Sequence, residues 1–380
     1  MSAAGADTTR RGTAVAVMSQ RQLTWLRFRR HKLALVSLFV VLFMYLLAAL
    51  AGFFAPQDAS RKDLDYANCP PMPVRFSLDR GGFYTPLLVQ KIDEVTLRKT
   101  YVHDEQKVLK LGFFVEGDEY RLIGLLPCRT HFFGADPHAN GWTCDADRVG
   151  FLMMGGDKYG RDILSRLFHG ARVSLSVGIV GIAVTFVLGL TIGGISGYVS
   201  GRTDLLIQRF IEIINSFPRL PMWLALGAAV PTDWSPLKTY FAITVALSLL
   251  SWTGLARVVR GKILSLREED YAVAARLLGA GHRRILFRHL LPGFTSHIIV
   301  SLTLSIPGMI LGETSLSFLG LGLRDPVVSW GVMLQDCMDI EAVRYYPWLM
   351  APVIMIVMTV LCFNFLGDGL RDAADPYSAR

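Results

Sequence analysis

Residues 270–292 read DYAVAARLLGAGHRRILFRHLLP and lie between two long apolar runs. Three alanines open the stretch, Gly279 follows, and a basic segment leads to Leu291-Pro292. This pattern predicts a short helix, a tight turn and a second short helix, because glycine suits the turn and Pro292 favours the start of a new helix. We expect the loop to lie at a membrane surface, where it can receive force from a soluble partner.

The composition of the chain indicates an all-α integral membrane protein. Of its 380 residues 52% are hydrophobic and 18% charged, and the mean hydropathy is +0.39. The apolar residues form long blocks instead of alternating, and a block of about 20 residues can cross the roughly 30 Å of hydrocarbon in a bilayer. We expect six transmembrane helices, in residues 33–55, 172–199, 205–229, 238–256, 293–315 and 347–367.

The distribution of Lys and Arg predicts how these spans are oriented. Residues 1–32 contain seven basic side chains and one acid, and the loop 257–292 contains eight basic side chains and three acids. Residues 230–237 contain no Lys or Arg. We therefore expect the N-terminal segment 1–32, the loop 257–292 and the tail 369–380 to be cytoplasmic. The net charge of +8 mostly reflects this bias, and the absence of a basic–aromatic platform argues against nucleic-acid binding.

Residues 56–154 differ in composition from the spans and are expected to lie outside, as a periplasmic insertion that is mostly β. Alternating stretches at 108–115 and 119–126 predict two short strands around a turn at Glu116-Gly117-Asp118. The insertion could cap the outer mouth of the bundle or serve as a docking platform for a substrate-binding protein. A disulfide between Cys128 and Cys144 is expected here, although other pairings remain open.

Residues 155–178 read GGDKYGRDILSRLFHGARVSLSVG. Asp162 precedes a stretch with one apolar and one basic face, so 155–171 is expected to be an amphipathic segment that lies along the membrane interface before the chain turns inward at Arg172. The transmembrane core would then comprise residues 172–368. The chain has no phosphate-binding GxxxxGK[ST] pattern, so we expect no nucleotide site. No Cys/His spacing predicts a metal site.

Several motifs together resemble the oligopeptide/dipeptide permease family of bacterial ABC importers. The stretch 270–292 is similar to the family's EAA coupling loop, and 155–178 is similar to its GTDxxGRDxxSRLxxGxRxSL signature. Two positions depart from these patterns, because Gly156 stands in place of Thr and Val273 in place of the acidic residue. Further similar stretches are IINSFPRLP at 213–221, SLSFLGLGLRDPVVSWGVMLQD at 315–336 and FNFLGDGLRDAADP at 363–376.

The resemblance implies a type I ABC importer permease fold with six transmembrane helices in the bacterial inner membrane. It also implies four kinds of partner: a homologous six-helix permease that completes a heterodimer, two ABC ATPase subunits, a periplasmic substrate-binding protein and membrane lipid. No cofactor would be bound by this chain, and peptides, nickel chelates and related solutes remain open as cargo. The residues expected to couple to the ATPases are Tyr271, Ala274, Ala275, Gly279, Ala280, Arg283, Leu291 and Pro292.

A membrane-embedded enzyme, a secondary transporter and a channel are the alternatives. The acidic and histidine residues of the spans are Glu212, His297 and Glu313, and these lie near span ends without a catalytic spacing. Glu313 could either meet substrate or cap a helix. The candidates for a substrate path or gate are Glu313, Ser315, Ser317 and Phe217.

Overall fold

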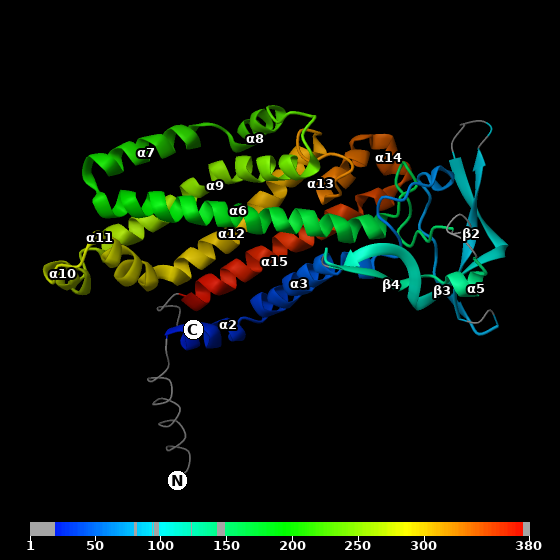
Figure 1. The fold of residues 1–380 in the computed structure, drawn as a ribbon, viewed down its shortest axis with the longest axis horizontal. Helices are drawn as coiled ribbons and strands as arrows, with labels where there is room; N and C mark the ends of the chain where they lie inside the picture. Colours follow the sequence, from blue (N-terminus) through cyan, green and yellow to red (C-terminus); the bar gives the residue numbers. More distant parts are fainter. Residues whose placement is uncertain are drawn as a thin grey trace, which may run out of the picture.

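The computed structural model describes residues 20–79, 82–92, 94, 99–122, 124–142 and 149–374. The protein is an elongated helical bundle with a four-stranded sheet at one end (Figure 1). Within the described residues, five helical stretches are long and apolar enough to cross a membrane. They are α3 (Lys32–Ala49), α6 (Ile163–Val199), α9 (Pro236–Leu266), the stretch His282–Phe318 and the stretch Pro347–Ala374.

The N-terminal span packs against the C-terminal one. This span is α3, which is preceded by the polar helix α2 (Gln20–Arg30) and followed by the short helix α4 (Ala51–Phe54). Its buried side chains, among them Ala34, Val41 and Met44, belong to the same core as residues of α15 (Ala351–Ala374). Small residues allow a close crossing, since a Cβ on Gly369 would overlap that of Ala34.

Helices α6 and α9 lie side by side because α6 presents glycines at every fourth position. Gly189, Gly193 and Gly197 all face α9, and a Cβ added to Gly193 would lie 2.4 Å from the carbonyl oxygen of Ala256. Backbones can approach this closely only where a side chain is absent. The two longest described helices therefore form one rigid unit.

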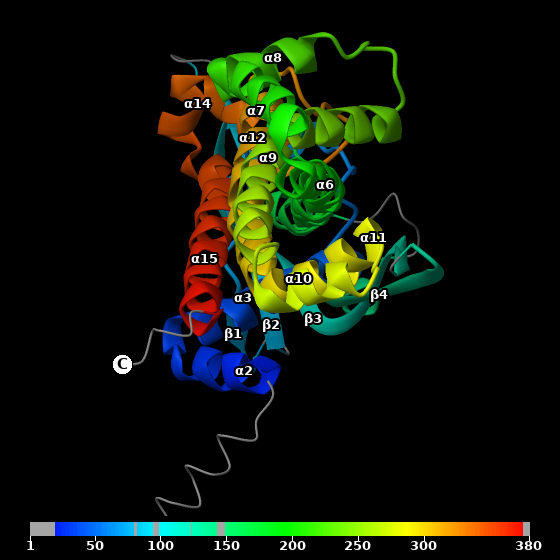
Figure 2. The same ribbon diagram turned by 90° about the vertical axis from the view of Figure 1, so that its left-hand side faces the viewer.

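The third predicted span is not one continuous helix, which corrects the expectation for 205–229. The chain forms α7 (Gly201–Ser216) and α8 (Arg219–Ala228) instead. Phe217 is extended, with φ −86° and ψ 137°, because the residue before a proline is disfavoured in helical geometry and Pro218 follows it. Both helices lie along the outside of α6 and α9 (Figures 1 and 2).

The prediction of a separate interfacial helix that ends near Arg172 is wrong. Helix α6 starts at Ile163 and runs without a break to Val199. The side chains of Arg161 and Arg166 are buried, so the basic face of this segment points into the protein. Its charges are satisfied by internal ion pairs, described below, which a sequence pattern could not reveal.

The sheet consists of β1 (Arg75–Ser77), β2 (Gly82–Ile92), β3 (Lys99–Leu122) and β4 (Leu126–Ala135), antiparallel and in that order. The predicted turn at 116–118 is wrong, because β3 continues through it with an irregularity between Glu116 and Tyr120. The hairpin closes instead after Leu122, where Gly124 has φ +77°.

Shorter elements complete the end of the bundle next to the sheet. They are η1 (Leu64–Tyr66), α5 (Pro137–Asn140), α13 (Trp330–Met333), η5 (Leu334–Met338), α14 (Ile340–Tyr345) and η6 (Pro347–Met350). The opposite end carries α10 (Asp270–Leu277) and α11 (His282–Arg284), followed by α12 (Thr295–Phe318). Helix α2 and the end of α15 lie toward α10 and α11 (Figure 1).

Candidate functional site

The loop between α9 and α12 projects from the end of the bundle opposite the sheet (Figure 1). Helix α10 is followed by a left-handed turn at Gly279, with φ +78°. The backbone N–H of Ala280 donates to Ala275 O, and that of Gly279 donates to Arg276 O, both at 3.0 Å. These two bonds define a Schellman motif, in which glycine is favoured because a Cβ is disfavoured at positive φ. The predicted short helix and tight turn are therefore present.

The inner face of the loop is firmly packed. Ala272 and Ile285 are fully buried against α9 residues that include Val259 and Ile263. Three residues predicted to couple to the ATPases also face this core, because Leu291 is buried and Ala275 and Ala280 are partly buried in it. Their positions suit a role in fixing the shape of the loop.

The outer face of the loop carries two leucines that are not among the predicted coupling residues. Leu277 and Leu278 are 83% and 88% exposed. Four of the predicted coupling residues are exposed in the same loop, namely Tyr271, Ala274, Gly279 and Arg283, and Pro292 is exposed at the start of the following span. These two leucines are the most exposed large apolar side chains described in the loop. A helix of only eight residues has too weak a periodicity to show which face is outward.

Polar contacts tie the loop to the end of α6. The Tyr198 hydroxyl lies 2.9 Å from Nδ1 of His282, at the start of α11. Arg267 Nη1 donates to the carbonyl oxygens of Gly197 and Tyr198. Displacement of the loop would therefore move α6 and α9 as well.

A second tie joins α9 to the start of α7. Arg260 donates from Nε and Nη2 to the two carboxylate oxygens of Asp204, each at 2.6 Å. This bidentate geometry fixes both distance and orientation. The corner that it holds contains Ser200, which has the uncommon φ of +62° for a residue other than glycine. The start of α7 is thus clamped onto the same unit as the loop.

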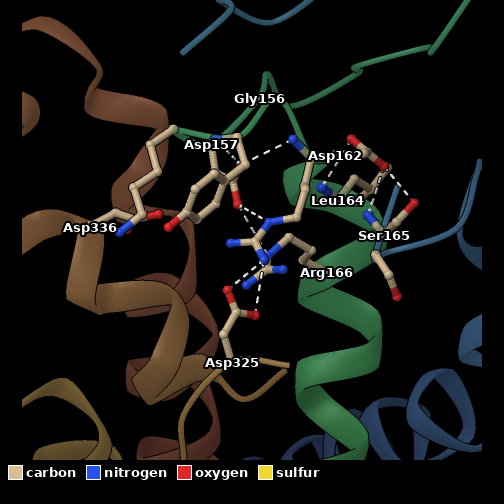
Figure 3. A network of polar contacts seen from close by, with 12 residues as sticks. Gly156, Asp157, Asp162, Leu164, Ser165, Arg166, Asp325 and Asp336 are labelled. Carbon is tan, nitrogen blue, oxygen red and sulfur yellow. Dashed lines mark hydrogen bonds and ion pairs between the residues drawn. The ribbon is translucent and has the colours of Figure 1, made fainter. Parts of the chain in front are cut away.

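At the sheet end, an ion network built on the buried side chains of Asp157, Arg161 and Arg166 replaces the expected exposed basic face. Arg161 Nε donates to Asp157 at 2.6 Å and its Nη1 donates to both oxygens of Asp325, at 2.9 and 2.7 Å. Arg166 Nε lies 3.5 Å from Asp157, and Lys158 Nζ lies 3.0 Å from Asp336. Figure 3 shows Asp157 and Arg166, at the start of α6, together with Asp325 and Asp336 from the segment after α12. The network thus joins the start of α6 to the segment that follows α12.

Asp162 begins α6 as a buried N-cap. Its Oδ2 accepts hydrogen bonds from the backbone N–H of Ser165 at 2.8 Å and from the Ser165 hydroxyl at 2.6 Å, as Figure 3 shows. Burial raises the pKa of this carboxyl to about 6, although the hydrogen bonds from Ser165 and Leu164 oppose the shift. The group therefore gains its proton far more readily than an exposed aspartate does.

Glu313 is fully buried and accepts hydrogen bonds from three serine hydroxyls. Ser317 and Ser329 donate to Oε1 at 2.8 and 2.7 Å, and Ser174 donates to Oε2 at 3.3 Å. The carboxylate thus joins α6, α12 and the start of α13. Because Glu313 and Ser317 are both completely inaccessible, neither lines an accessible path in this structure, in contrast to the expectation.

The other predicted path residues are more accessible. Phe217 is exposed at the break between α7 and α8, and Ser315 is partly exposed, with its hydroxyl donating to Leu311 O. The predicted disulfide involves Cys144, which lies outside the described residues. Among the residues that the structure describes, no group of three or more His, Cys, Asp or Glu side chains is arranged to hold a metal ion.

Comparison with known proteins defines the class to which this bundle and loop belong. Residues 189–378 match the family described as the inner membrane component of binding-protein-dependent transport systems. The chain belongs to this family. Residues 19–71 match a second family, described as the N-terminal transmembrane domain of oligopeptide transport permease C. The motif resemblance is thereby confirmed over both ends of the chain.

Individual relatives cover nearly the whole chain. The oligopeptide transport system permease protein OppC of Bacillus subtilis is 31% identical over 92% of this chain and 88% of its own length. The dipeptide transport system permease protein DppC of Lactococcus lactis is 31% identical over 98% and 94%. Among solved structures, the MetNI methionine ABC transporter in inward-facing conformations aligns with 55% of this chain and 95% of its own, at 18% identity and a TM-score of 0.43.

Proposed function

We propose that this chain is one membrane half of an ATP-driven importer of peptides. The proposal of peptide cargo is supported by the similar proteins from Bacillus subtilis and Lactococcus lactis, whose names describe oligopeptide and dipeptide transport. Catalysis in the membrane has less support, because Glu313, the buried carboxylate of α12, is held by serines and not by a catalytic partner. A substrate-binding protein would deliver the cargo.

The α10–α11 loop would couple transport to ATP hydrolysis. The observation that carries this proposal is the contrast between its two faces, with Ala272 and Ile285 fully buried and Leu277 and Leu278 almost fully exposed. A rigid knob with an apolar apex can fill a groove on a soluble ATPase and transmit its movement. The ties from His282 and Arg267 to the end of α6 then carry that movement into the bundle.

A second, homologous permease would cover α7 and α8. Within α7, which is described in full, Ile211 is the only buried residue. The exposed large apolar side chains of α7 and α8 are Leu205, Leu206, Phe210, Ile213 and Leu220, and Phe217 lies between the two helices. A heterodimer that uses this face would place the cargo path between the subunits. ATP binding by the partner ATPases would favour one arrangement of the pair, and hydrolysis would release it.

The chain would bind no nucleotide or other cofactor itself, since its sequence contains no GxxxxGK[ST] pattern. The excess of Lys and Arg in residues 1–32 and 257–292 supports a cytoplasmic location for the loop and both termini. The sheet would then face the periplasm. The insertion would act there as an ordered cap or as a platform for the binding protein.

The two exposed leucines provide the test of coupling. We expect the double variant Leu277→Ser, Leu278→Ser to reach the membrane and to lose co-purification with the ATPase subunits, because these side chains contribute little to the core of this chain. Ile340→Ser in α14 is the matched control, since Ile340 is 84% exposed at the opposite end. Wild-type amounts of bound ATPase in the double variant would refute the assignment of the loop.

A further inference from the structure

The β3–β4 hairpin carries an exposed apolar surface that transport does not explain. Phe113 and Phe114 on β3 are 52% and 65% exposed, and Leu125 and Leu126 at the closed end are 81% and 63% exposed. We call the described residues Leu122, Gly124, Leu125 and Leu126 the tip of the hairpin. Soluble surfaces rarely gather large apolar side chains in this way without a partner.

The hairpin is mounted rigidly on the end of the first span. The ring of Tyr120 packs so closely on Gly52 that a Cβ there would lie 2.4 Å from it. His131 is buried between two carbonyl oxygens, with Nδ1 2.6 Å from Ala55 O and Nε2 3.0 Å from Asp118 O. The height of the hairpin relative to the span is therefore fixed.

The order of these contacts shows that the hairpin descends along the span. His131 lies level with Ala55, and Tyr120, which is closer to the tip, lies level with Gly52, three residues deeper in the span. The strands continue beyond Tyr120 to the tip at about 3.3 Å per residue. Figure 1 shows the hairpin curving back beside the bundle, and in both views it lies on the side away from α7.

The depth reached by the tip is that of the membrane interface. Helices α3 and α4 together span residues 32–54, about 34 Å at 1.5 Å per residue, slightly more than the hydrocarbon core. Arg172 donates to Ala48 O at 3.2 Å and to Ala49 O at 3.1 Å, which marks a polar boundary near the end of α3. The tip of the hairpin points from the sheet toward the height of Ala48 and Ala49 on the first span.

Aromatic rings join the hairpin to the span at the same height. Phe53 of α4 lies 6.2 Å from Phe114 and 5.9 Å from Phe132, and Phe54 lies 5.6 Å from Phe132, measured between ring centroids. Aromatic side chains gather at the interface between hydrocarbon and water. The cluster therefore continues the lipid-facing surface of the first span, where Phe43 and Leu46 are exposed.

Charged residues around the tip suit lipid headgroups. Arg121 and Arg129 flank it on the two strands and are exposed. Arg129 pairs with Glu119 at 3.2 Å, so this acid does not prevent approach to a lipid surface. The side chain of Arg121, beside the apolar tip, can extend toward phosphates while the leucines enter the acyl region.

We propose that the tip of the β3–β4 hairpin inserts into the membrane leaflet next to the sheet and anchors the insertion there. The bilayer, instead of a protein partner, would cover Leu125, Leu126 and Phe114. The anchor would hold the sheet at a fixed height and tilt beside the first span. This role depends on the chain spanning a membrane but not on the identity of its cargo.

The test is a depth measurement on the full chain in vesicles of phosphatidylethanolamine and phosphatidylglycerol. A single cysteine is introduced as Leu125→Cys, after the native cysteines have been replaced by alanine, and is labelled with an environment-sensitive fluorophore. Ala139→Cys is the matched control, because Ala139 is exposed on α5 of the same insertion. Quenching is measured with nitroxide-labelled lipids and with aqueous iodide.

We expect the label at position 125 to be quenched by the nitroxide lipids and to be several-fold less sensitive to iodide than the label at position 139. Equal sensitivity to iodide at the two positions would overturn the proposal. Protection from both quenchers, or protection that arises only when the partner permease or binding protein is added, would show instead that a protein covers the tip. A label on Leu126→Cys should give the same quenching pattern, which would show that the fluorophore at position 125 does not itself draw the tip into the membrane.

Discussion

Gly279 shows how one residue sets the form of the coupling loop. Its φ of +78° closes the Schellman motif after α10, yet the space around its α-carbon is open, with no atom within 4 Å of an added Cβ. The requirement for glycine is therefore a requirement of backbone conformation and not of packing. Its role follows from the sequence, because a glycine after a short helix and before a basic segment predicts such a turn.

We expect Gly279→Val to insert normally and to lose most of the substrate-stimulated ATPase activity of the assembled transporter. A residue other than glycine costs about 1–2 kcal/mol in the left-handed region, so the loop should shift and misplace Leu277 and Leu278. The measurement is stimulated ATP hydrolysis at equal amounts of assembled complex.

Gly281→Val is the matched control for this experiment. Gly281 has equally open surroundings but an ordinary φ of −66°, so valine should be accepted there. Equal stimulation in the two variants would show that the left-handed turn does not matter for coupling.

Asp162 should give the protein a measurable pH dependence of stability. Burial raises its folded pKa from 3.8 to about 6, so the folded state binds this proton more tightly than the unfolded chain does. The resulting stabilisation is fully present below pH 3.8 and is lost as the pH rises through about 6. Two pKa units correspond to a difference of about 3 kcal/mol.

The variant Asp162→Asn should remove this dependence while it keeps an oxygen that can accept the N-cap hydrogen bonds. We expect its Tm, relative to wild type, to rise between about pH 4 and pH 7. Asp65→Asn, at an exposed site, should change little over the same range. A Tm difference between Asp162→Asn and wild type that stays constant with pH would contradict the burial of an ionisable carboxyl at this position.

Among the elements, α6 and α9 form the unit to which the α10–α11 loop is joined. Their contact depends on glycines, and we expect Gly193→Ala to force the helices apart because the new Cβ would meet Ala256 O. Overpacking of this kind costs about 1–3 kcal/mol, which thermal unfolding in detergent should register as a lower Tm.

Gly254→Ala tests the specificity of that effect. Gly254 lies within α9, where an added Cβ would have no atom within 4 Å, and alanine favours helix by about 1 kcal/mol over glycine. Its Tm should therefore equal or exceed that of wild type. A larger loss of stability in Gly254→Ala than in Gly193→Ala would mean that the α6–α9 contact is not as close as described.

Helices of this protein could be predicted far better than its strands. Long apolar blocks can be recognised as membrane-spanning helices by their length, because few backbone structures other than a helix can cross a membrane. Pro218 can be seen in the sequence, but the sequence does not show that it divides this segment into two separate helices. On β3, Gly117 was mistaken for a turn, since an irregular strand and a turn both use glycine. The ion network of Asp157, Arg161 and Asp325, in which Asp157 and Arg161 are buried, joins segments that are far apart in sequence. The sequence pattern alone could not bring these segments together.

At the scale of the whole molecule, the two ends of the bundle differ in structure. One end carries the α10–α11 loop, tied through Tyr198 and Arg260 to α6, α7 and α9. The other end carries the sheet, the ion pairs around the buried Asp157 and the hydrogen bonds to the buried Glu313. Under the proposed function, the chain would receive force at the α10–α11 loop and hold its shape at the sheet end.

Reconstitution of the purified chain in vesicles tests this account most directly. The chain alone should show no ATP hydrolysis and no accumulation of peptide under an imposed proton gradient. Addition of a homologous permease, the two ATPase subunits and the binding protein should produce ATP-dependent peptide uptake. If the isolated chain concentrates any solute under a proton gradient, it is a secondary transporter, and its assignment as the permease half of an ATP-driven importer is contradicted.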